Sequence, residues 1–210
     1  MNDVWSWDFV FDRTTNGTSL KWLVIVDEFT RECLTLKVGR GIRSEDVIDT
    51  LAELFVIRGV PNHIRSDNGP EFIATAIRTW LAHMNVSTLY IEPGSPWENA
   101  YCESFNSRFR DEFLAMEEFD SVRDARRLTH DYLHAYNHER PHSSLSYQTP
   151  AEFAALQTSA QARQTGVAPP TFAVTSTSEA SVKAEATAKA DGAQPNTPGK
   201  PNSISLTRLS

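Results

Sequence analysis

Hydrophobic and polar residues alternate at the start of the chain with the period of a β-strand. Over residues 4–11 the side chains on one side are Trp5, Trp7, Phe9 and Phe11, and those on the other include Ser6, Asp8 and Val10. Asn16 and Gly17 then predict a turn, and residues 20–26 and 32–38 are typical of two further strands. This part of the chain therefore predicts an antiparallel meander of three strands.

From Ser44 onward the apolar positions recur with the period of an α-helix, and short strands separate the helices. Ser44 is expected to cap a helix over 45–58 that Gly59 ends, and a short strand then ends at Asp67. The elements expected after it are a helix over 71–84, a strand over 87–91, a helix that carries Glu103 and reaches 116, and a helix over 121–137. This order predicts an α/β fold in which three antiparallel strands and then two parallel ones form a five-stranded mixed sheet with helices on both faces.

The composition changes sharply near residue 156. Up to Leu156 the chain is rich in Trp, Phe, Leu, Ile and Val, whereas from Gln157 it consists mainly of Ala, Thr, Ser, Pro, Gln and Gly. Such a segment buries too little apolar surface to offset the entropy lost on ordering. We therefore expect one globular domain over residues 1–156 and a disordered tail over 157–210.

The globular part is acidic. Residues 1–157 hold 15 Lys and Arg against 24 Asp and Glu, a net charge of −9, while the rest holds 5 against 3. This balance argues against a stand-alone DNA-binding module, but it permits an enzyme that gains affinity from metal ions, local arginines and another domain. Two distant cysteines, no signal peptide and no apolar run of membrane-spanning length predict a cytoplasmic protein without a membrane partner.

Three carboxylates stand where a metal-dependent phosphodiester chemistry would need them. Asp8 lies within the first strand, Asp67 ends a later strand, and Glu103 follows Asp67 after thirty-five intervening residues, in the first turns of a helix. Two Mg²⁺ ions need hard oxygen ligands that converge from rigid elements. The Glu103 helix has a polar face and an aromatic face, formed respectively by Glu103, Asn106, Ser107 and Arg110 and by Tyr101, Phe105, Phe109 and Phe113. Glu103 can therefore face a polar cleft while its helix packs through the aromatic face.

Five motifs in this order resemble the integrase-core transposases of bacterial insertion sequences, which are related to retroviral integrases. They are Trp5-Ser6-Trp7-Asp8-Phe9, Val26-Asp27-Glu28-Phe29-Thr30-Arg31-Glu32, Ser66-Asp67-Asn68-Gly69-Pro70-Glu71-Phe72, Glu103-Ser104-Phe105-Asn106 and Tyr136-Asn137-His138-Glu139-Arg140-Pro141-His142. The resemblance covers residues 1 to about 155. It implies a ribonuclease-H-like fold and an enzyme that cleaves DNA and transfers strands during transposition.

The resemblance also implies the site and its partners. Asp8, Asp67 and Glu103 would be the catalytic triad and the ligands of two Mg²⁺ ions, with Mn²⁺ able to substitute. Asp8 would bridge both metals. The partners would be the ends of an insertion sequence, target DNA and further copies of this chain on DNA, in the bacterial nucleoid.

Other residues are candidates for contact with DNA. Arg110 and Arg140 are expected near the cleft, where phosphate contact and a plain surface charge are both open interpretations. Trp97 would stack on a base or anchor its loop. Asn106 and His142 complete the candidate DNA contacts.

Two residue patterns have simpler interpretations. Asp27, at the end of the second strand, is expected to have a turn or structural role in place of a metal ligand. The four histidines spaced four residues apart from His130 to His142 could share a zinc ion, but Pro141 interrupts the helix and no cysteine lies near. Structural or DNA-facing roles are favoured for them.

The start and end of the chain depart from the family pattern. Family members usually carry about a hundred further residues before the first catalytic strand, including a helical DNA-binding segment, whereas this chain begins seven residues before Asp8. A truncated copy, an incorrectly assigned start and an excised domain are the three explanations. The alternative functions are therefore a non-catalytic transposase remnant and a nuclease of the ribonuclease-H type.

Overall fold

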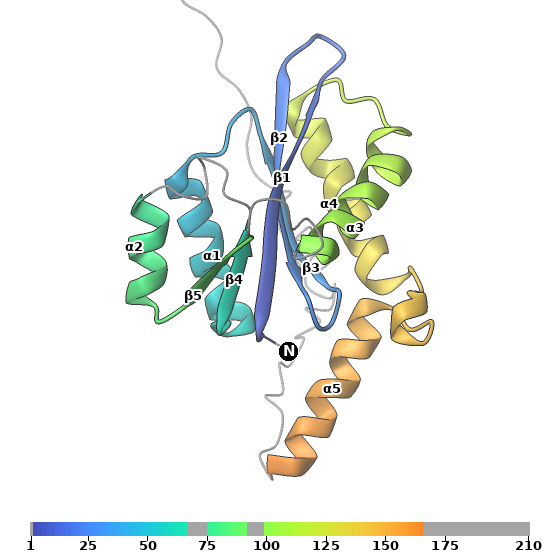
Figure 1. The fold of residues 1–210 in the computed structure, drawn as a ribbon. Coiled ribbons are helices and arrows are strands. Elements are labelled where there is room, and N and C mark those ends of the chain that lie inside the picture. Colours follow the sequence, from blue (N-terminus) through green and yellow to red (C-terminus); the bar gives the residue numbers. More distant parts are fainter. Residues whose placement is uncertain (1, 67–74, 92–98, 166–210) are drawn as a thin grey trace, which may run out of the picture. The chain divides into compact units, whose positions relative to one another are not determined.

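A five-stranded mixed sheet in the order β3-β2-β1-β4-β5 forms the centre of the fold in this computed structural model, which describes residues 2–66, 75–91 and 99–165 (Figure 1). The strands are β1 (Val4–Arg13), β2 (Ser19–Asp27), β3 (Cys33–Gly39), β4 (His63–Ser66) and β5 (Ser87–Tyr90). β1, β2 and β3 pair in antiparallel fashion, whereas β4 runs parallel to both β1 and β5. The predicted sheet of three antiparallel strands followed by two parallel ones is confirmed.

Helices cover both faces of the sheet, as the order of elements predicted (Figure 1). The helices are α1 (Ser44–Arg58), α2 (Thr75–His83), α3 (Ala100–Phe109), α4 (Val122–His138) and α5 (Pro150–Thr165), with a π-helix η2 (Arg110–Leu114) and a 3₁₀-helix η3 (Ser143–Leu145). α1 and α2 pack on one face, and α3 and α4 on the other.

The alternation along β1 divides the core into these two layers. Trp5, Trp7 and Phe9 are buried with residues of α1 and α2. Val10 faces the opposite layer, where Trp22 of β2 is buried with the aromatic residues of α3. Because β1 lies in the middle of the sheet with apolar residues on both sides, it is held in place by two hydrophobic layers.

The ends of α1 show one correct and one wrong prediction. Gly59 ends the helix as expected: its φ is +88°, and its N–H donates to the Phe55 carbonyl over 3.0 Å. Ser44 is not the capping residue, because it is already the first residue of the helix and Arg43 occupies the extended cap position. The Asp46 carboxylate stabilises this end by accepting the Arg43 backbone N–H over 2.8 Å.

The helix that carries Glu103 packs through three of its four expected aromatic residues. Phe105, Phe109 and Phe113 are buried, and the α-helix changes to the π-helix η2 after Phe109, so the expected single helix to residue 116 is wrong. Tyr101 is 41% exposed, which corrects its predicted place among the buried aromatics. At this first turn the guanidinium of Arg31 lies 3.7 Å from the centre of the Tyr101 ring and covers it in place of the core.

Helix α5 was not expected. Its start carries a capping box: the Glu152 N–H donates to the Thr149 hydroxyl over 3.2 Å, and the Thr149 N–H donates to the Glu152 carboxylate over 2.9 Å. Pro150 is the first residue of the helix, a position that proline favours. The helix continues to Thr165, past the expected start of the tail at 157, while residues 166–210 lie outside the described part of the chain.

The contrast between Phe109 and Tyr101 predicts different stability costs on one helix. Phe109→Ala should lower the free energy of unfolding by about 3–5 kcal/mol, because it empties a fully buried site. Tyr101→Ala should cost less than about 1 kcal/mol, since it removes one exposed ring and its cation–π contact. Urea denaturation of both variants measures the difference, and equal costs would contradict the described packing of α3.

Candidate active site

Asp8 lies on the face of β1 that is covered by α3 and α4. It sits opposite Val24 of β2, and its neighbours Trp7 and Phe9 point into the other layer. The side chain is half-buried. A carboxylate in the middle of the central strand has little positional freedom, which is what a metal ligand or a catalytic acid requires.

Helix α3 reaches Asp8 through a hydrogen bond from Asn106. The Asn106 side-chain amide donates from Nδ2 to Oδ2 of Asp8 over 2.6 Å, and the Phe9 N–H donates to Oδ1 over 2.7 Å. Asn106 is 2% exposed, and its Oδ1 has no hydrogen-bond donor within the part of the chain that the structure describes. The short contact to a carboxylate therefore orients Asp8 from the helix above it.

Glu103 precedes Asn106 by three residues on the same helix, and its side chain is exposed. Residues three apart on an α-helix are neighbours on its surface, so Glu103 starts from the side of the helix that meets Asp8. Burial of Cys102 and Phe105 on either side of it fixes the rotation of the helix. Two of the three expected carboxylates thus belong to elements that are in direct contact.

Asp67, the third expected acid, lies outside the described residues, as does Trp97. The strand that leads to Asp67 is described. The parallel register joins Ser6 to Arg65, so β4 ends at Ser66 beside the part of β1 that carries Asp8. Within the described residues no group of three potential metal ligands occurs. Asp8 and Glu103 are the oxygen donors that a hard divalent cation prefers, so their chemistry fits magnesium.

Negative charge gathers around the start of α3, as its effect on a neighbouring thiol shows. Burial raises the pKa of the Cys102 thiol well above its usual value, and the negative charges of Asp8, Glu28 and Glu103 raise it further. Cys102 therefore stays a neutral thiol and is unsuited to nucleophilic attack. The same accumulation of negative charge suits the binding of a cation.

The described candidates for DNA contact differ in exposure. Arg110 is exposed at the start of η2. Arg140 forms an ion pair with Glu112 of η2. Asn106 and His142 are buried, and the His142 ring lies edge-on to Tyr136 at 5.0 Å between ring centres. Burial places Asn106 and His142 inside the domain, whereas Arg110 remains available at its surface.

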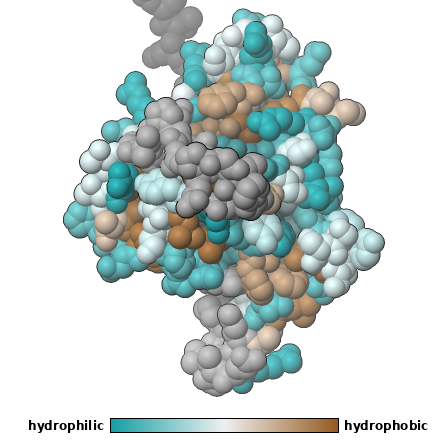
Figure 2. Space-filling model, viewed as in Figure 1, coloured by the Kyte–Doolittle hydropathy of each residue, from teal (hydrophilic) through white to brown (hydrophobic). Residues whose placement is uncertain are grey.

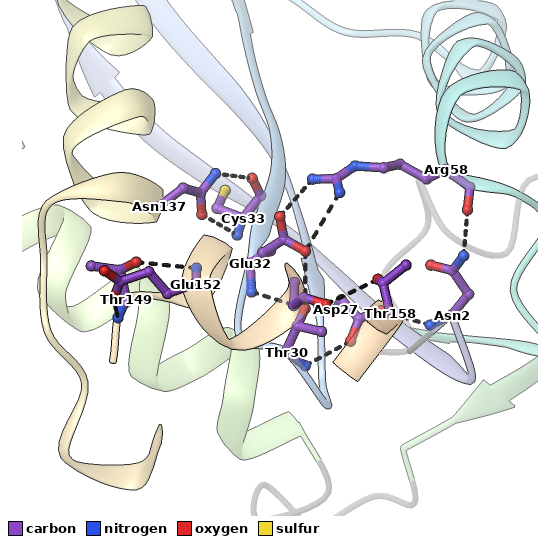
Figure 3. A network of polar contacts seen from close by, with 11 residues as sticks. Asn2, Asp27, Thr30, Glu32, Cys33, Arg58, Asn137, Thr149, Glu152 and Thr158 are labelled. Atoms are coloured by element: carbon purple, nitrogen blue, oxygen red, sulfur yellow. Dashed lines mark hydrogen bonds and ion pairs between the residues drawn. The ribbon is translucent and has the colours of Figure 1, made fainter. Parts of the chain in front are cut away.

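Asp27 has the structural role that its turn position predicted (Figure 3). It is 1% exposed, and its carboxylate accepts the backbone N–H groups of Asn2, Phe29 and Thr30, each over 2.9 Å. Its own N–H donates to the Glu32 carbonyl over 3.0 Å. Asp27 therefore closes the turn between β2 and β3.

Three polar contacts around this turn were missed by sequence reasoning. Glu32 is buried and pairs with Arg58 of α1 over 2.7 Å (Figure 3). Asn137 bonds both backbone groups of Cys33, so the end of α4 is tied to β3. Glu28 accepts from Arg65 over 2.8 Å and from the Ser6 hydroxyl, two strand positions from Asp8. No local sequence pattern predicts such pairs, because the partners are far apart in the sequence.

Comparisons with known proteins agree with this geometry. A profile of the family described as "Integrase core domain" matches residues 1–96, and a second profile with the same description matches residues 84–150. The chain is 44% identical over 161 residues to the "Insertion element IS476 uncharacterized 39.2 kDa protein" of Xanthomonas euvesicatoria, an alignment that covers 77% of this chain and 46% of that protein. It is 41% identical over 171 residues to the "Insertion element IS407 uncharacterized 31.7 kDa protein" of Burkholderia multivorans, covering 81% of this chain and 60% of that protein. The chain thus spans only about half of these relatives.

Solved structures share the fold. The catalytic core domain of the HTLV-2 integrase in complex with magnesium (trimeric form) superposes with a TM-score of 0.58 at 16% identity, covering 72% of this chain and 95% of that one. The catalytic core domain of the BIV integrase superposes with a TM-score of 0.57 at 20% identity, and the match covers 77% of this chain and 99% of that one. The predicted ribonuclease-H-like fold is therefore confirmed. None of the helices in the described residues is long and apolar enough to cross a membrane.

The burial of His142 predicts a dependence of stability on pH. Burial, together with the positive charges of Arg108, Arg140 and Arg31, lowers the pKa of His142 to about 4, so the folded protein holds it neutral. In the unfolded chain a histidine binds its proton below a pH of about 6.5, and stability must therefore fall as the pH drops from there toward 4.

His142→Phe should remove this component of the pH dependence, which is worth up to about 3 kcal/mol at the acid end. Urea denaturation of both proteins at a series of pH values measures it. The carboxylates titrate in both proteins, so the difference between the two curves isolates the histidine. A constant difference across the range would contradict this, because it would mean that folding leaves the pKa of His142 unchanged.

Proposed function

Since this chain belongs to the integrase core family, whose members include insertion-element proteins, we propose that it is the catalytic core of a transposase that cleaves and rejoins DNA. The observation that carries the proposal is the hydrogen bond from Asn106 to Asp8, because it joins the Glu103 helix to the central strand. The two acids come from the two elements that the family's catalytic triad would need in contact.

In this proposal Asp8, Asp67 and Glu103 would hold two Mg²⁺ ions, to both of which Asp8 would contribute, and Mn²⁺ would be able to replace Mg²⁺. Bound there, the ions would supply Lewis-acid stabilisation of the attacking and leaving oxygens. The contribution of the chain is to hold the carboxylates in position. β1 is fixed by two hydrophobic layers, and α3 is fixed by its buried aromatic residues.

The proposed reaction has two steps of the same kind. In the first, a water oxygen attacks a phosphodiester in line, forms a new bond to phosphorus and releases a 3′-OH. In the second, that 3′-OH attacks a phosphodiester of target DNA, and the 3′ oxygen of the target leaves. Neither step forms a bond to the protein. One arrangement of acids serves both steps because their geometries are alike.

The burial of Asn106 and His142 changes their proposed roles. Asn106 acts on Asp8, and His142 packs in the core, so neither is proposed to touch DNA. Arg110, exposed next to the end of α3, remains a candidate for phosphate contact. Arg140 is a weaker candidate, because its pair with Glu112 already balances its charge. Trp97 is still proposed to stack on a base.

The partners follow from the family and are proposed with it. They are the ends of an insertion sequence, target DNA and further copies of this chain assembled on DNA. A helical DNA-binding segment, separate from the described domain, would select the ends. The relatives extend well beyond the region matched here, which leaves room for such a segment in them.

Asp67→Asn and Glu103→Gln should each abolish strand transfer of a labelled, pre-cut element end in Mg²⁺ or Mn²⁺, since each removes a metal ligand. Glu117→Gln, which changes an exposed glutamate beyond η2, is the matched control and should keep wild-type activity. Sequencing the DNA that flanks the gene supplies the end sequence.

Wild-type strand transfer by either triad variant would refute the assignment of the acids. Cleavage of branched DNA or of RNA–DNA hybrids without strand transfer would instead identify a nuclease. Complete inactivity of the wild-type chain on every substrate would identify a non-catalytic remnant.

Asn106→Ala should lower the rate of strand transfer by about 10–100-fold, because it removes the group that orients a metal ligand. Its effect should include a higher Mg²⁺ concentration for half-maximal activity, which a purely structural role would not change. Asn106→Asp matches the size of the side chain but puts a second acceptor against Asp8, so it should be at least as harmful. An unchanged Mg²⁺ dependence in both variants would contradict the positioning role.

A further inference from the structure

Three exposed arginines, Arg40, Arg123 and Arg126, line one hollow on the surface. None of them forms an ion pair with a carboxylate of the described residues. Four arginines, Arg58, Arg65, Arg127 and Arg140, form ion pairs to carboxylates. Further exposed arginines such as Arg13, Arg43 and Arg110 also form no ion pair with a carboxylate of the described residues, but they do not line the hollow. What sets Arg40, Arg123 and Arg126 apart is that they line the same hollow, and three such cations close together in a domain with a net charge of −9 suit an external anion.

The hollow has a volume of about 570 Å³ and lies where three segments meet. These are the turn between β1 and β2, the residues after β3 and the start of α4. The hairpin tip is fixed to the segment before α4 by the Thr15 N–H, which donates to the Phe119 carbonyl over 2.9 Å. Figure 2, drawn in the same orientation as Figure 1, shows residues of hydrophilic and intermediate hydropathy at this tip, at the top.

The balance of charge in the hollow is positive. Asp120 is the single acid among its lining residues, against three arginines. The Arg126 Nε donates to the Val38 carbonyl over 3.2 Å, which holds this side chain along the rim. Guanidinium groups bind phosphate through paired hydrogen bonds and are always charged. Phosphate is therefore the anion that this lining suits best.

The hollow lies on the same side of the sheet as the candidate catalytic acids. α4 and α3 pack on one face of β1, the face toward which Asp8 points. From Asp8 to the end of β1 at Arg13 the strand advances five residues, which is roughly 17 Å at about 3.3 Å per residue. Stacked base pairs of a duplex advance about 3.4 Å each, so this span corresponds to roughly five base pairs.

We propose that this arginine-lined hollow binds the phosphate backbone of duplex DNA, about five base pairs from the phosphodiester at the acids. The surface holds DNA without reading its sequence, because backbone contacts position a duplex and base contacts specify it. The inference rests on the proposed action on DNA, and adds a second contact region that contains none of the catalytic candidates. It also explains how an acidic domain retains a polyanion: the positive charge is local.

The test compares DNA binding by the full chain and by Arg40→Ala/Arg123→Ala. Fluorescence anisotropy with a labelled duplex, in EDTA over a series of salt concentrations, separates binding from catalysis. The variant should bind several-fold more weakly, and the slope of log affinity against log salt should become shallower by about 2, one for each lost phosphate contact. Arg126 is kept because its side chain also bonds to β3.

The matched control is Arg78→Ala/Arg127→Ala, which removes two charges from exposed arginines outside the lining of the hollow. It should keep nearly the wild-type slope. Urea denaturation checks that both double variants fold. Arg40→Glu, a single change at an exposed loop residue, provides a second variant and should weaken binding further than Arg40→Ala.

Several outcomes would overturn the proposal. They are a wild-type slope in Arg40→Ala/Arg123→Ala, an equal loss in the control, and no DNA binding by the wild type at low salt. Displacement of DNA by inorganic phosphate at matched ionic strength would identify a small-anion site. Equal displacement by poly-glutamate would identify an acidic protein partner.

Failure of the proposed reaction is distinguishable from failure of this site. Glu103→Gln should keep the wild-type binding slope, because Glu103 is not part of the hollow. A chain that binds DNA through Arg40 and Arg123 yet transfers no strands would refute the reaction and support the surface. If the wild type transfers strands but Arg40→Ala/Arg123→Ala keeps the wild-type salt dependence of DNA binding, the result would support the reaction and refute the surface.

Discussion

The packing of helix α3 onto the sheet is the interaction on which the candidate site depends. Phe105 and Phe109 are fully buried, and the ring of Phe109 meets that of Trp22 edge-on at 5.8 Å between ring centres. Burying each ring contributes about 2–3 kcal/mol, so the rotation of the helix is strongly determined. That rotation turns Asn106 toward Asp8 and leaves Glu103 on the polar side. A small rotation of α3 would separate the helix from the acid on β1.

Two largely buried acids of this domain are paired with arginines. Glu28 and Glu32 take arginine partners from β4 and α1, and both pairs are largely shielded from water. Removing one partner would leave a buried charge unpaired, which is far more costly than losing a surface pair. Arg58 and Arg65 therefore stabilise the fold and are not available to bind an external anion. Only arginines outside the core, such as Arg40 and Arg123, remain to meet an external anion, which is why a binding surface can exist on an acidic protein.

Local patterns predicted much of the fold because the physics behind them is local. The alternation around Asp8 identified the strand that lies at the centre of the sheet, and Gly59 was correctly predicted to end α1. Prediction failed where residues distant in the sequence decide whether a side chain is buried. Tyr101 had the spacing of a core residue, but its side of the first turn of α3 lies outside the core and meets Arg31 instead.

The sequence by itself determined the strand that holds Asp8, the helix that holds Glu103 and the family to which their motifs point, because periodicity and short motifs are properties of neighbouring residues. Only the tertiary structure decided that Asn106 serves Asp8, that His142 is buried, and that arginines from a loop and from α4 share one hollow. These pairings join residues far apart in the chain. They depend on how the layers pack, and no local spacing encodes that arrangement.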